Sequence, residues 1–325
     1  MKTISTTNSR GEFVRAPSEF RNWVTQDGTA GPTGSGGFKA EPGRYHLYVT
    51  YNCPWAHRTL IFRALKKLED VISISVAHPQ RTPEGWSFLL NDANSSDGLN
   101  GFYYLKEAYE MAAPGYEGRY TVPVLWDKNT QTIVSNESAD IIRMLNSAFN
   151  EFTPNQDNFY PLPSRAKIDE INTFVYNQIN NGVYRAGFAK SQAAYEQAYN
   201  DVFAALDELE ELLSHQHYLL GDQLTEADWR LFPTLIRFDL AYYGVFKCNK
   251  KRLVEYKHLW AYTRELYQYP GIAETVNVDH IKQGYWRNSE RNPLGIIPVG
   301  PELDLWEPHL RLRNEFARAS NLTGS

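Results

Sequence analysis

The chain contains 325 residues, of which 42% are hydrophobic and 22% are charged, and its formal net charge is −5. This length suits two domains, and the weak acidic balance gives no reason to expect a nucleic-acid or anionic-membrane partner. The polar stretch over 1–13 lacks the apolar core of a secretory signal, and no run of about 18 apolar residues predicts a transmembrane helix. Only two cysteines occur, Cys53 and Cys248, which fits a reducing, cytoplasmic compartment better than a disulfide scaffold.

Residues 1–44 form a predicted N-terminal arm of irregular structure. A glycine-rich run over 28–37 interrupts any helical or strand periodicity. We expect the aromatic side chains of Phe13, Phe20 and Trp23 to anchor this arm to the rest of the molecule.

The segment that follows carries a cysteine in an informative place. β-Forming residues predict a strand over 45–51, and apolar residues at helical spacing predict a helix over 54–68. Pro54 suits the first helical position, so Cys53 lies where unpaired N–H groups and the positive end of the helix dipole favour a thiolate. A helix N-terminus supplies about 0.3–1 kcal/mol, which lowers a cysteine pKa by roughly one at most, so further hydrogen-bond donors are expected. The alternative is a small buried cysteine without a chemical role.

Position 56 is alanine, so the motif is C-P-W-A and not C-x-x-C. A disulfide formed at Cys53 then has no neighbouring thiol to resolve it, which argues against an internal dithiol cycle. The resolving thiol is expected to come from outside, and glutathione is the obvious intracellular candidate.

The remaining elements of segment 45–150 follow the order of a thioredoxin fold. Strands are predicted over 71–76, 121–127 and 132–134, and a helix begins at 135–138 and runs to 145. A long insertion over 79–120 is expected to be functional because such loops are uncommon in compact domains. The fold context favours a cis bond between Val122 and Pro123.

The second half of the chain predicts an all-helical domain over 161–290. Apolar residues recur at spacings of three and four, which is typical of helices packed in a core. Thr225 and Asp228 form a predicted capping box. Residues 152–163 are the expected linker, and 291–325 a proline-rich tail. Cys248 lies in a polar stretch and is expected to be an incidental surface or loop thiol.

Together these features resemble the cytosolic glutathione transferases, and more specifically the glutathionyl-hydroquinone reductases of the Xi class. That resemblance implies an α/β N-terminal thioredoxin-like domain followed by an all-α C-terminal domain. It covers nearly the whole chain and rests on NCPWAHR at 52–58, the arm residues 13–15 and 20–21, Gly85-Trp86, the strand 121–127 and the tail residues 292–298.

The resemblance assigns roles to individual residues. Cys53 is similar to the family's nucleophile. Trp86 resembles the residue that lies over glutathione, and the stretch from Arg119 to Val122 resembles the one that contacts it, with the Val122 backbone pairing with the cysteinyl unit. The residues that resemble the remaining glutathione contacts and the substrate-pocket tyrosines are Glu137 and Ser138 at the γ-glutamyl end and Tyr184, Tyr242 and Tyr285 in the helical half.

The alternatives to these roles stay open at this point. Glu137 and Ser138 suit a glutamyl group because a helix N-terminus attracts a carboxylate and a Glu side chain suits an ammonium group, but they could merely cap the helix. Any one of 21 tyrosines is more often a half-buried core residue than a catalytic group.

The resemblance implies reduction of glutathionyl-hydroquinones through a Cys53–glutathione mixed disulfide, with glutathione as co-substrate, no metal and a homodimeric assembly. Two other functions remain open: an Omega-like glutathione thioltransferase or dehydroascorbate reductase, and a non-enzymatic protein that binds aromatic ligands.

Overall fold

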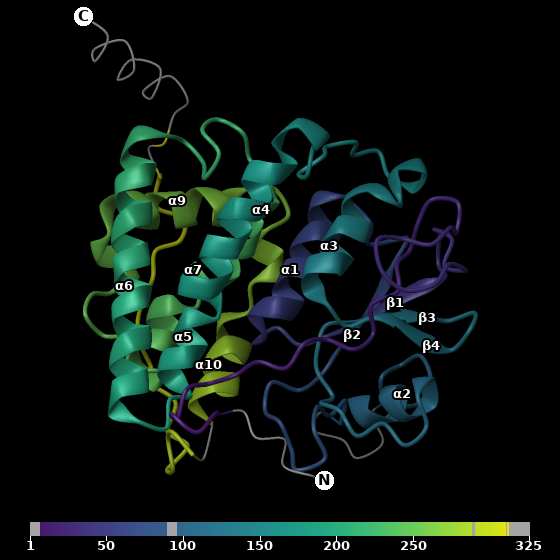
Figure 1. Cartoon of the computed structure of the whole chain (residues 1–325), viewed down its shortest axis with the longest axis horizontal. Coiled ribbons are helices and arrows are strands. Elements are labelled where there is room, and N and C mark those ends of the chain that lie inside the picture. Colours follow the sequence, from purple (N-terminus) through teal and green to yellow (C-terminus); the bar gives the residue numbers. More distant parts are fainter. Residues whose placement is uncertain (1–6, 90–95, 288–289, 310, 312–325) are drawn as a thin grey trace, which may run out of the picture. The chain divides into compact units, whose positions relative to one another are not determined.

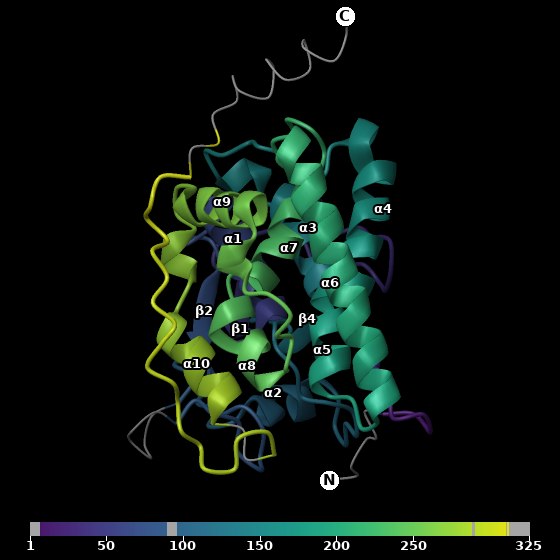
Figure 2. The same ribbon diagram turned by 90° about the vertical axis from the view of Figure 1, so that its left-hand side faces the viewer.

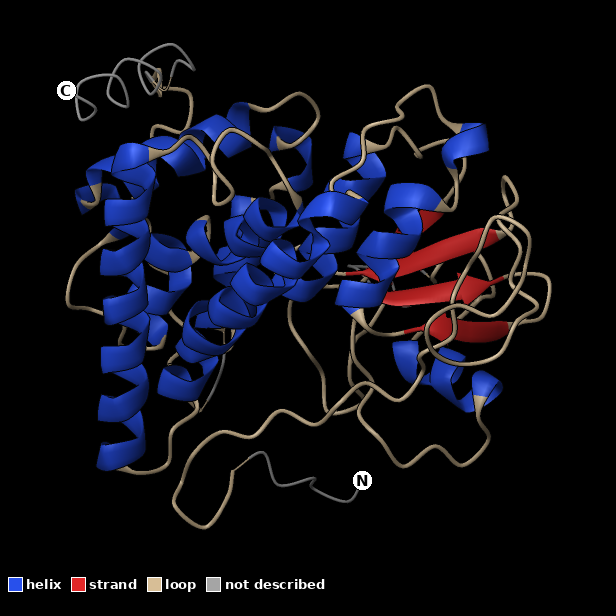
Figure 3. Ribbon diagram, turned by 45° about the horizontal axis from the view of Figure 1, so that its top comes forward, coloured by secondary structure: helices blue, strands red, loops and turns tan. Residues whose placement is uncertain are grey.

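The computed structural model describes residues 7–89, 96–287, 290–309 and 311. The chain divides into two compact units. The first comprises Ala16–Asn158 and Glu274–Ile297, and the second comprises Phe159–Ala273 with the described parts of Thr6–Arg15 and Pro298–Ser325. Figure 3 shows that the named strands, in red, all belong to the first unit, whereas the second is built of helices and loops. Within the described ranges, no helix is long and apolar enough to cross a membrane.

A four-stranded mixed sheet forms the centre of the first unit. Its strands are β1 (Tyr45–Val49), β2 (Ser73–Val76), β3 (Val124–Asp127) and β4 (Thr132–Ser135). The spatial order is β2-β1-β3-β4, with β1 parallel to β2 and antiparallel to β3, which pairs antiparallel with β4. This is the predicted thioredoxin-like arrangement, and the fold class is therefore confirmed.

Helices cover both faces of this sheet. The helices α1 (Pro54–Leu65) and α3 (Ser138–Ser147) pack together on one face, and α2 (Leu105–Ala112) lies on the other (Figure 1). The first unit also contains the short turn η1 (Asn150–Phe152) and the helix α10 (Val278–Trp286). The predicted helical segment 161–290 therefore contributes its last helix to the unit that holds the sheet.

The insertion 79–120 is tied to the sheet by one buried carboxylate. Asp97 accepts hydrogen bonds from the backbone N–H groups of Leu99, Asn100 and Phe102 and from the Tyr48 hydroxyl at 2.8 Å. Charge satisfied in this way can be buried at low cost. Sequence reasoning predicted a loop here and missed both this anchor and the helix α2.

Among the described residues of the second unit, every named element is a helix or a helical turn, and loops connect them. Its elements are η2 (Leu162–Ser164), α4 (Arg165–Phe174), the π-helix η3 (Val175–Asn180), α5 (Gly182–Gly187), α6 (Gln192–His215), α7 (Glu226–Leu235), the π-helix η4 (Phe238–Tyr242), α8 (Tyr243–Val245), η5 (Leu253–Glu255) and α9 (Lys257–Gln268). The turn η6 (Ala273–Thr275) lies at the boundary between the two units. The capping box predicted at Thr225 and Asp228 is present at the start of α7.

The part of the C-terminal tail that belongs to the second unit contacts α9, and the tail is drawn in yellow in Figure 2. The Gln268 amide donates to the carbonyls of Leu305 and Glu307 at 2.8 and 2.9 Å. The buried Arg311 guanidinium contacts Glu265 at 3.0 Å and donates to the Leu213 carbonyl at 3.4 Å, in the last turn of α6. A cation at this position complements the negative end of the helix dipole.

Cys248 corrects a sequence-based expectation. It lies in the loop after α8, but its side chain is fully buried, and burial raises the pKa of the thiol to about 12. Its neighbours Lys247 and Asn249 are exposed, so this segment alternates between solvent and core. A polar local composition therefore concealed a buried, protonated thiol.

Candidate active site

Cys53 is the N-cap residue of α1, as the sequence predicted. Its backbone is extended, with φ −80° and ψ 120°, and Pro54 occupies the first turn of the helix. That turn carries no acidic residue that would offset the positive end of the dipole. The thiol is half-buried, and its Sγ faces the Val122 carbonyl oxygen at 3.7 Å. This is an environment that favours a thiolate at a partly accessible position.

The Val122 segment brings a second backbone to the thiol. The Val122–Pro123 bond is cis, as the fold context predicted, and β3 begins at the next residue, Val124. Val122 itself lies outside the β1–β3 ladder. Its carbonyl oxygen faces the thiol, so the backbone at Val122 lies beside the sulfur.

Asn52, directly before the nucleophile candidate, joins three segments. Its side chain accepts a hydrogen bond from the Thr50 hydroxyl and donates to the Pro79 carbonyl at 3.2 Å. It also touches α10 at Gly284, where an added Cβ would fall 2.1 Å from Asn52 Nδ2. Only glycine permits this approach. It packs the helix that carries Tyr285 directly against the loop that carries Cys53.

His57 and Arg58 have structural partners in the same unit. His57 is buried and its Nε2 lies 2.8 Å from the Thr275 hydroxyl. The Arg58 guanidinium lies over the Trp55 ring at 4.6 Å and 3.4 Å from the Ser138 hydroxyl, which it approaches as a donor. These contacts join α1 to α3 and to the segment before α10.

Trp86 is buried within the insertion, and an arginine that sequence reasoning missed lies over its ring. The Arg81 guanidinium is 5.2 Å from the ring centroid. Burial lowers the pKa of Arg81, the charge of the half-buried Arg119 lowers it further, and Cys53 opposes both. The Arg81 side chain keeps an exposed surface. No periodicity or motif marks Arg81 in the sequence, because its relation to Cys53 depends on the course of the insertion.

Glu137 and Ser138 lie at the start of α3. Glu137 is the N-cap residue, and its Oε1 accepts from the Ala139 N–H at 3.0 Å. The capping alternative is therefore correct for this side chain, and a glutathione contact remains a prediction. The second oxygen, Oε2, accepts from the Ser18 hydroxyl in the N-terminal arm at 2.9 Å. Two donors thus orient the half-buried carboxylate.

The three predicted pocket tyrosines are divided between the two units. Tyr285 is buried on α10 in the unit of the sheet. Tyr184 lies on α5 and Tyr242 on η4 in the helical unit, with ring centroids 6.1 Å apart. Gly182 is the first residue of α5.

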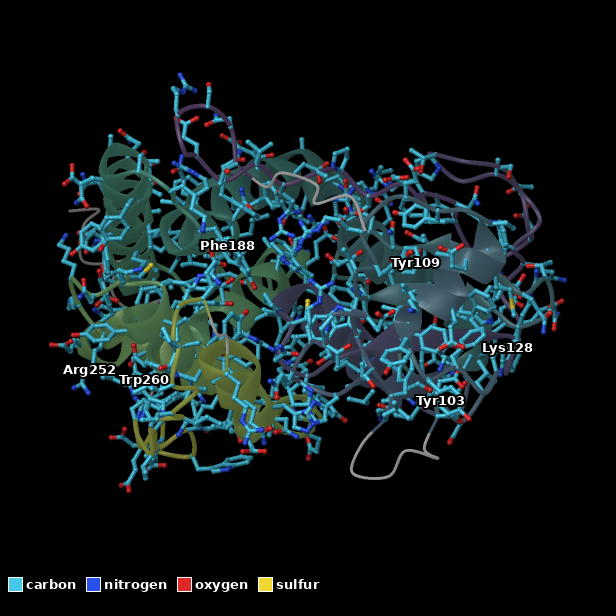
Figure 4. The ribbon with its side chains drawn as sticks, turned by 90° about the horizontal axis from the view of Figure 1, so that it is seen from below. Tyr103, Tyr109, Lys128, Phe188, Arg252 and Trp260 are labelled. Atoms are coloured by element: carbon cyan, nitrogen blue, oxygen red, sulfur yellow. The ribbon has the colours of Figure 1, made fainter. Side chains whose placement is uncertain are left out.

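Tyr184 is the centre of an aromatic cluster, which we define as Phe13, Tyr184, Phe188, Tyr242 and Phe246. Phe188, labelled in Figure 4, stacks on Tyr184 at 5.8 Å, and Phe246 meets the same ring edge-on at 5.3 Å. Gly187 permits this packing because an added Cβ would fall 2.2 Å from the Phe246 ring. Tyr184 is therefore closely packed among the aromatic rings of this cluster.

The described residues contain no group of three or more His, Cys, Asp or Glu side chains arranged to hold a metal ion.

A sheet-bearing unit with a cysteine at the first helix and a helical second unit define a class of protein, and comparison with known families identifies it. Residues 52–148 match the family model of the glutathione S-transferase N-terminal domain, and residues 192–265 match that of the C-terminal domain. The chain belongs to the glutathione S-transferase family.

Its relatives narrow the assignment to the Xi class, which confirms the resemblance. The chain is 53% identical over 310 residues to glutathionyl-hydroquinone reductase YqjG of Escherichia coli, covering 94% of each sequence, and 46% identical to PcpF of Sphingobium chlorophenolicum, covering 95% of each. The glutathione-bound structure of YqjG superposes with a TM-score of 0.88, covering 90% of this chain and 96% of YqjG. The Xi transferase of Phanerochaete chrysosporium is 47% identical, with a TM-score of 0.85 and coverage of 91% and 99%.

Proposed function

We propose that this chain is a glutathionyl-hydroquinone reductase that uses glutathione to remove a glutathionyl group from a hydroquinone ring. One observation carries the proposal: Cys53 is a half-buried thiol at a helix N-terminus, and the residue one turn away is Ala56. A thiolate in this position can attack sulfur, but only an external thiol can complete the cycle. The names of the YqjG and PcpF relatives supply the substrate class.

In the first step the Cys53 thiolate attacks the glutathionyl sulfur of the substrate. An S–S bond to Cys53 forms while the bond between sulfur and the ring carbon breaks, and the departing electron pair must be accepted. In a keto form of the substrate the ring carbon is sp³, so that pair restores an aromatic phenolate. We assign the proton transfers to Tyr184, because a phenol with an ordinary pKa near 10 can donate a proton at one site and recover it at another.

In the second step a glutathione thiolate attacks the Cys53–glutathione disulfide. Oxidised glutathione leaves and the Cys53 thiolate is regenerated. Overall, the glutathionyl-hydroquinone and one glutathione are converted into a hydroquinone and one molecule of oxidised glutathione. This is ping-pong chemistry with a covalent intermediate.

The glutathione site that we propose combines the residues assigned by resemblance with those that the fold adds. The Val122 backbone pairs with the cysteinyl unit, Trp86 covers it, and Glu137 with Ser138 holds the γ-glutamyl end. Arg119 and Arg81 supply positive charge near the thiol. Tyr242 and Tyr285 are assigned to the substrate pocket. Their hydroxyls are the further hydrogen-bond donors that the Cys53 thiolate needs in addition to the helix dipole.

Mass spectrometry tests the proposal directly. After incubation with a glutathionyl-hydroquinone and no free glutathione, the protein should gain one glutathione, mapped to Cys53, and release the free hydroquinone. Cys53→Ser should fold and show neither adduct nor turnover, because a serine hydroxyl stays protonated and cannot exchange with sulfur. Cys248→Ser is the matched control and should retain both. Turnover by Cys53→Ser would refute the mechanism.

A comparison of substrates separates this function from the two alternatives. A glutathionyl-hydroquinone reductase should turn over its quinol substrate faster than a simple glutathione mixed disulfide or dehydroascorbate, whereas an Omega-like thioltransferase should show the reverse order. A non-enzymatic binding protein would contain a Cys53 that reacts slowly with iodoacetamide at neutral pH.

We also propose that the protein acts in the cytoplasm as a homodimer. Two free cysteines in the chain and a dependence on reduced glutathione support a reducing compartment. The homodimer is inferred by analogy with the family.

A further inference from the structure

The N-terminal arm places a cation on the ring of Tyr184. The Arg15 guanidinium carbon lies 5.2 Å from the centroid of that ring and 5.6 Å from the centroid of Phe13. Arg15 Nε also donates to Asn181 Oδ1 at 3.2 Å. Asn181 directly precedes α5, the helix that carries Tyr184. The hydrogen bond to Asn181 and the contact with the Tyr184 ring therefore both hold the guanidinium against the start of this helix.

Backbone and aromatic contacts hold the arm in this position. The Lys190 N–H donates to the Gly11 carbonyl at 2.9 Å, and the Ser191 hydroxyl donates to the Arg10 carbonyl at 2.8 Å. Phe13 is buried and packs on Phe188 with ring centroids 5.2 Å apart. Arg15 therefore follows a docked segment of the same compact unit, and its place on Tyr184 is built into the fold.

Three other charged residues on the elements around α5 have partners of their own. On α5 itself, Arg185 pairs with Asp201 of α6 at 2.5 Å. In the arm, Glu12 pairs with Arg10 at 2.9 Å. From η4, Asp239 accepts hydrogen bonds from the backbone N–H groups of Leu253 and Val254.

We propose that Arg15 is a positioning residue that makes the Tyr184 phenol a stronger acid. A guanidinium over an aromatic face is attracted by the electrons of the ring, and the attraction increases when the ring becomes a phenolate, whose negative charge spreads into it. Arg15 thereby stabilises the form of Tyr184 that exists after proton donation. The inference rests on the proposed role of Tyr184 as proton donor, which it deepens.

Ultraviolet titration of the phenolate tests this electrostatic effect without any assay of activity. The Tyr184 signal is isolated as the difference between the protein and Tyr184→Phe, and again as the difference between Arg15→Gln and the double variant Arg15→Gln/Tyr184→Phe. Loss of the cation should raise the pKa of Tyr184 by about 0.5–1. Arg15→Lys should restore most of the difference because it keeps the charge. Arg10→Gln, which changes an arm arginine bound to Glu12, should leave the Tyr184 pKa unchanged.

Two results would overturn the inference. One is an unchanged Tyr184 pKa in Arg15→Gln. The other is an equal rise in Arg15→Gln and Arg15→Lys, which would assign the effect to packing of the arm rather than to charge. Thermal unfolding of each variant shows whether the arm substitutions affect folding.

Activity measurements distinguish a failure of this inference from a failure of the proposed function. With a glutathionyl-hydroquinone as substrate, Arg15→Gln should shift the alkaline limb of the pH–rate profile to higher pH, by the same amount as the rise in the Tyr184 pKa. It should also lower the rate at neutral pH about 3- to 10-fold. Exchange with a simple glutathione mixed disulfide should be unaffected because no carbon is protonated. If Tyr184→Phe retains quinol reduction, the proposed proton donor is wrong. If Tyr184→Phe is inactive but Arg15→Gln leaves the profile unmoved, only the role of Arg15 is wrong.

Discussion

Gly284 of α10 lies directly against the side chain of Asn52, the residue that precedes the proposed nucleophile. A Cβ at position 284 would fall 2.1 Å from Asn52 Nδ2. The amide cannot easily move away because Thr50 and Pro79 already hold it. This contact limits how closely the helix that carries Tyr285 can approach the loop that carries Cys53.

Gly284→Ala should therefore move α10 relative to the loop over 50–53. Alanine favours a helix over glycine by about 1 kcal/mol, but a contact this short forces a shift that overrides that gain. We expect quinol reduction to fall about tenfold or more and the thermal unfolding midpoint to fall. Gln283→Ala is the control, since its side chain bonds Asp279 within the same helix. Normal activity in Gly284→Ala would show that α10 does not position the site.

Tyr285→Phe should raise the pKa of the Cys53 thiol. The helix dipole lowers the pKa of a cysteine by roughly one, so a thiolate at neutral pH needs further hydrogen-bond donors. A phenol hydroxyl that donates to the thiolate lowers the same pKa by about one more. The measurement is the pH dependence of alkylation by iodoacetamide, for Tyr285→Phe, Tyr242→Phe and the double variant. The same alkylation profile in the double variant and the unaltered protein would exclude both hydroxyls as donors to the sulfur.

Ser18→Ala should weaken glutathione binding without changing the chemical step. Ser18 donates to Glu137 Oε2, whose other oxygen is held by the Ala139 N–H. A hydrogen bond to a charged group is worth about 1.5–3 kcal/mol, so a loss of half that value gives a rise of roughly 3- to 10-fold in KM for glutathione. Ser35→Ala, in the glycine-rich part of the arm, is the control. A lower kcat at unchanged KM would contradict a role for Glu137 in binding.

Stability should fall at mildly acidic pH because His46 is buried in its neutral form. Burial lowers the pKa of His46 to about 4, although Asp97 acts in the opposite direction, while Lys128 and Arg63 lower it further. Ser75 donates its proton to the Asp97 carbonyl, so its oxygen accepts from His46 Nε2–H at 2.9 Å, and His46 Nδ1 accepts from Ser73 at 2.7 Å.

The sign of this effect follows from the lowered pKa. The unfolded chain binds the proton below about pH 6.5, while the folded protein does not until about pH 4. The contribution of His46 is therefore complete above pH 6.5 and is lost as the pH falls toward 4, with an upper limit of roughly 3 kcal/mol. Urea unfolding between these values should be less pH-dependent in His46→Gln than in the unaltered protein, and unchanged in the surface control His215→Gln. Identical slopes in all three would show that His46 does not govern the effect.

Local sequence signals were sufficient for the elements that position Cys53. A β-forming run, a cysteine, a proline and a helical pattern are adjacent in the chain, so the strand-to-helix junction and the polarity of the helix dipole follow without knowledge of any distant contact. The same holds for the helices of the second unit and for the capping box at Thr225 and Asp228, where the residues that satisfy one another are three positions apart. The family motifs added Trp86, Glu137 and the tyrosines, which composition and periodicity would not have selected.

Only the tertiary structure decided the relationships between segments far apart in the chain. The contact between Asn52 and Gly284, the cation of Arg15 on Tyr184 and the hydrogen bond from Ser18 to Glu137 join residues separated by more than one hundred positions. The burial of Cys248 and the anchoring of the insertion by Asp97 were likewise hidden, because neighbouring residues there are polar. Such contacts depend on which distant segments the fold brings together and on how their side chains pack. A local pattern of residue types contains no information about either.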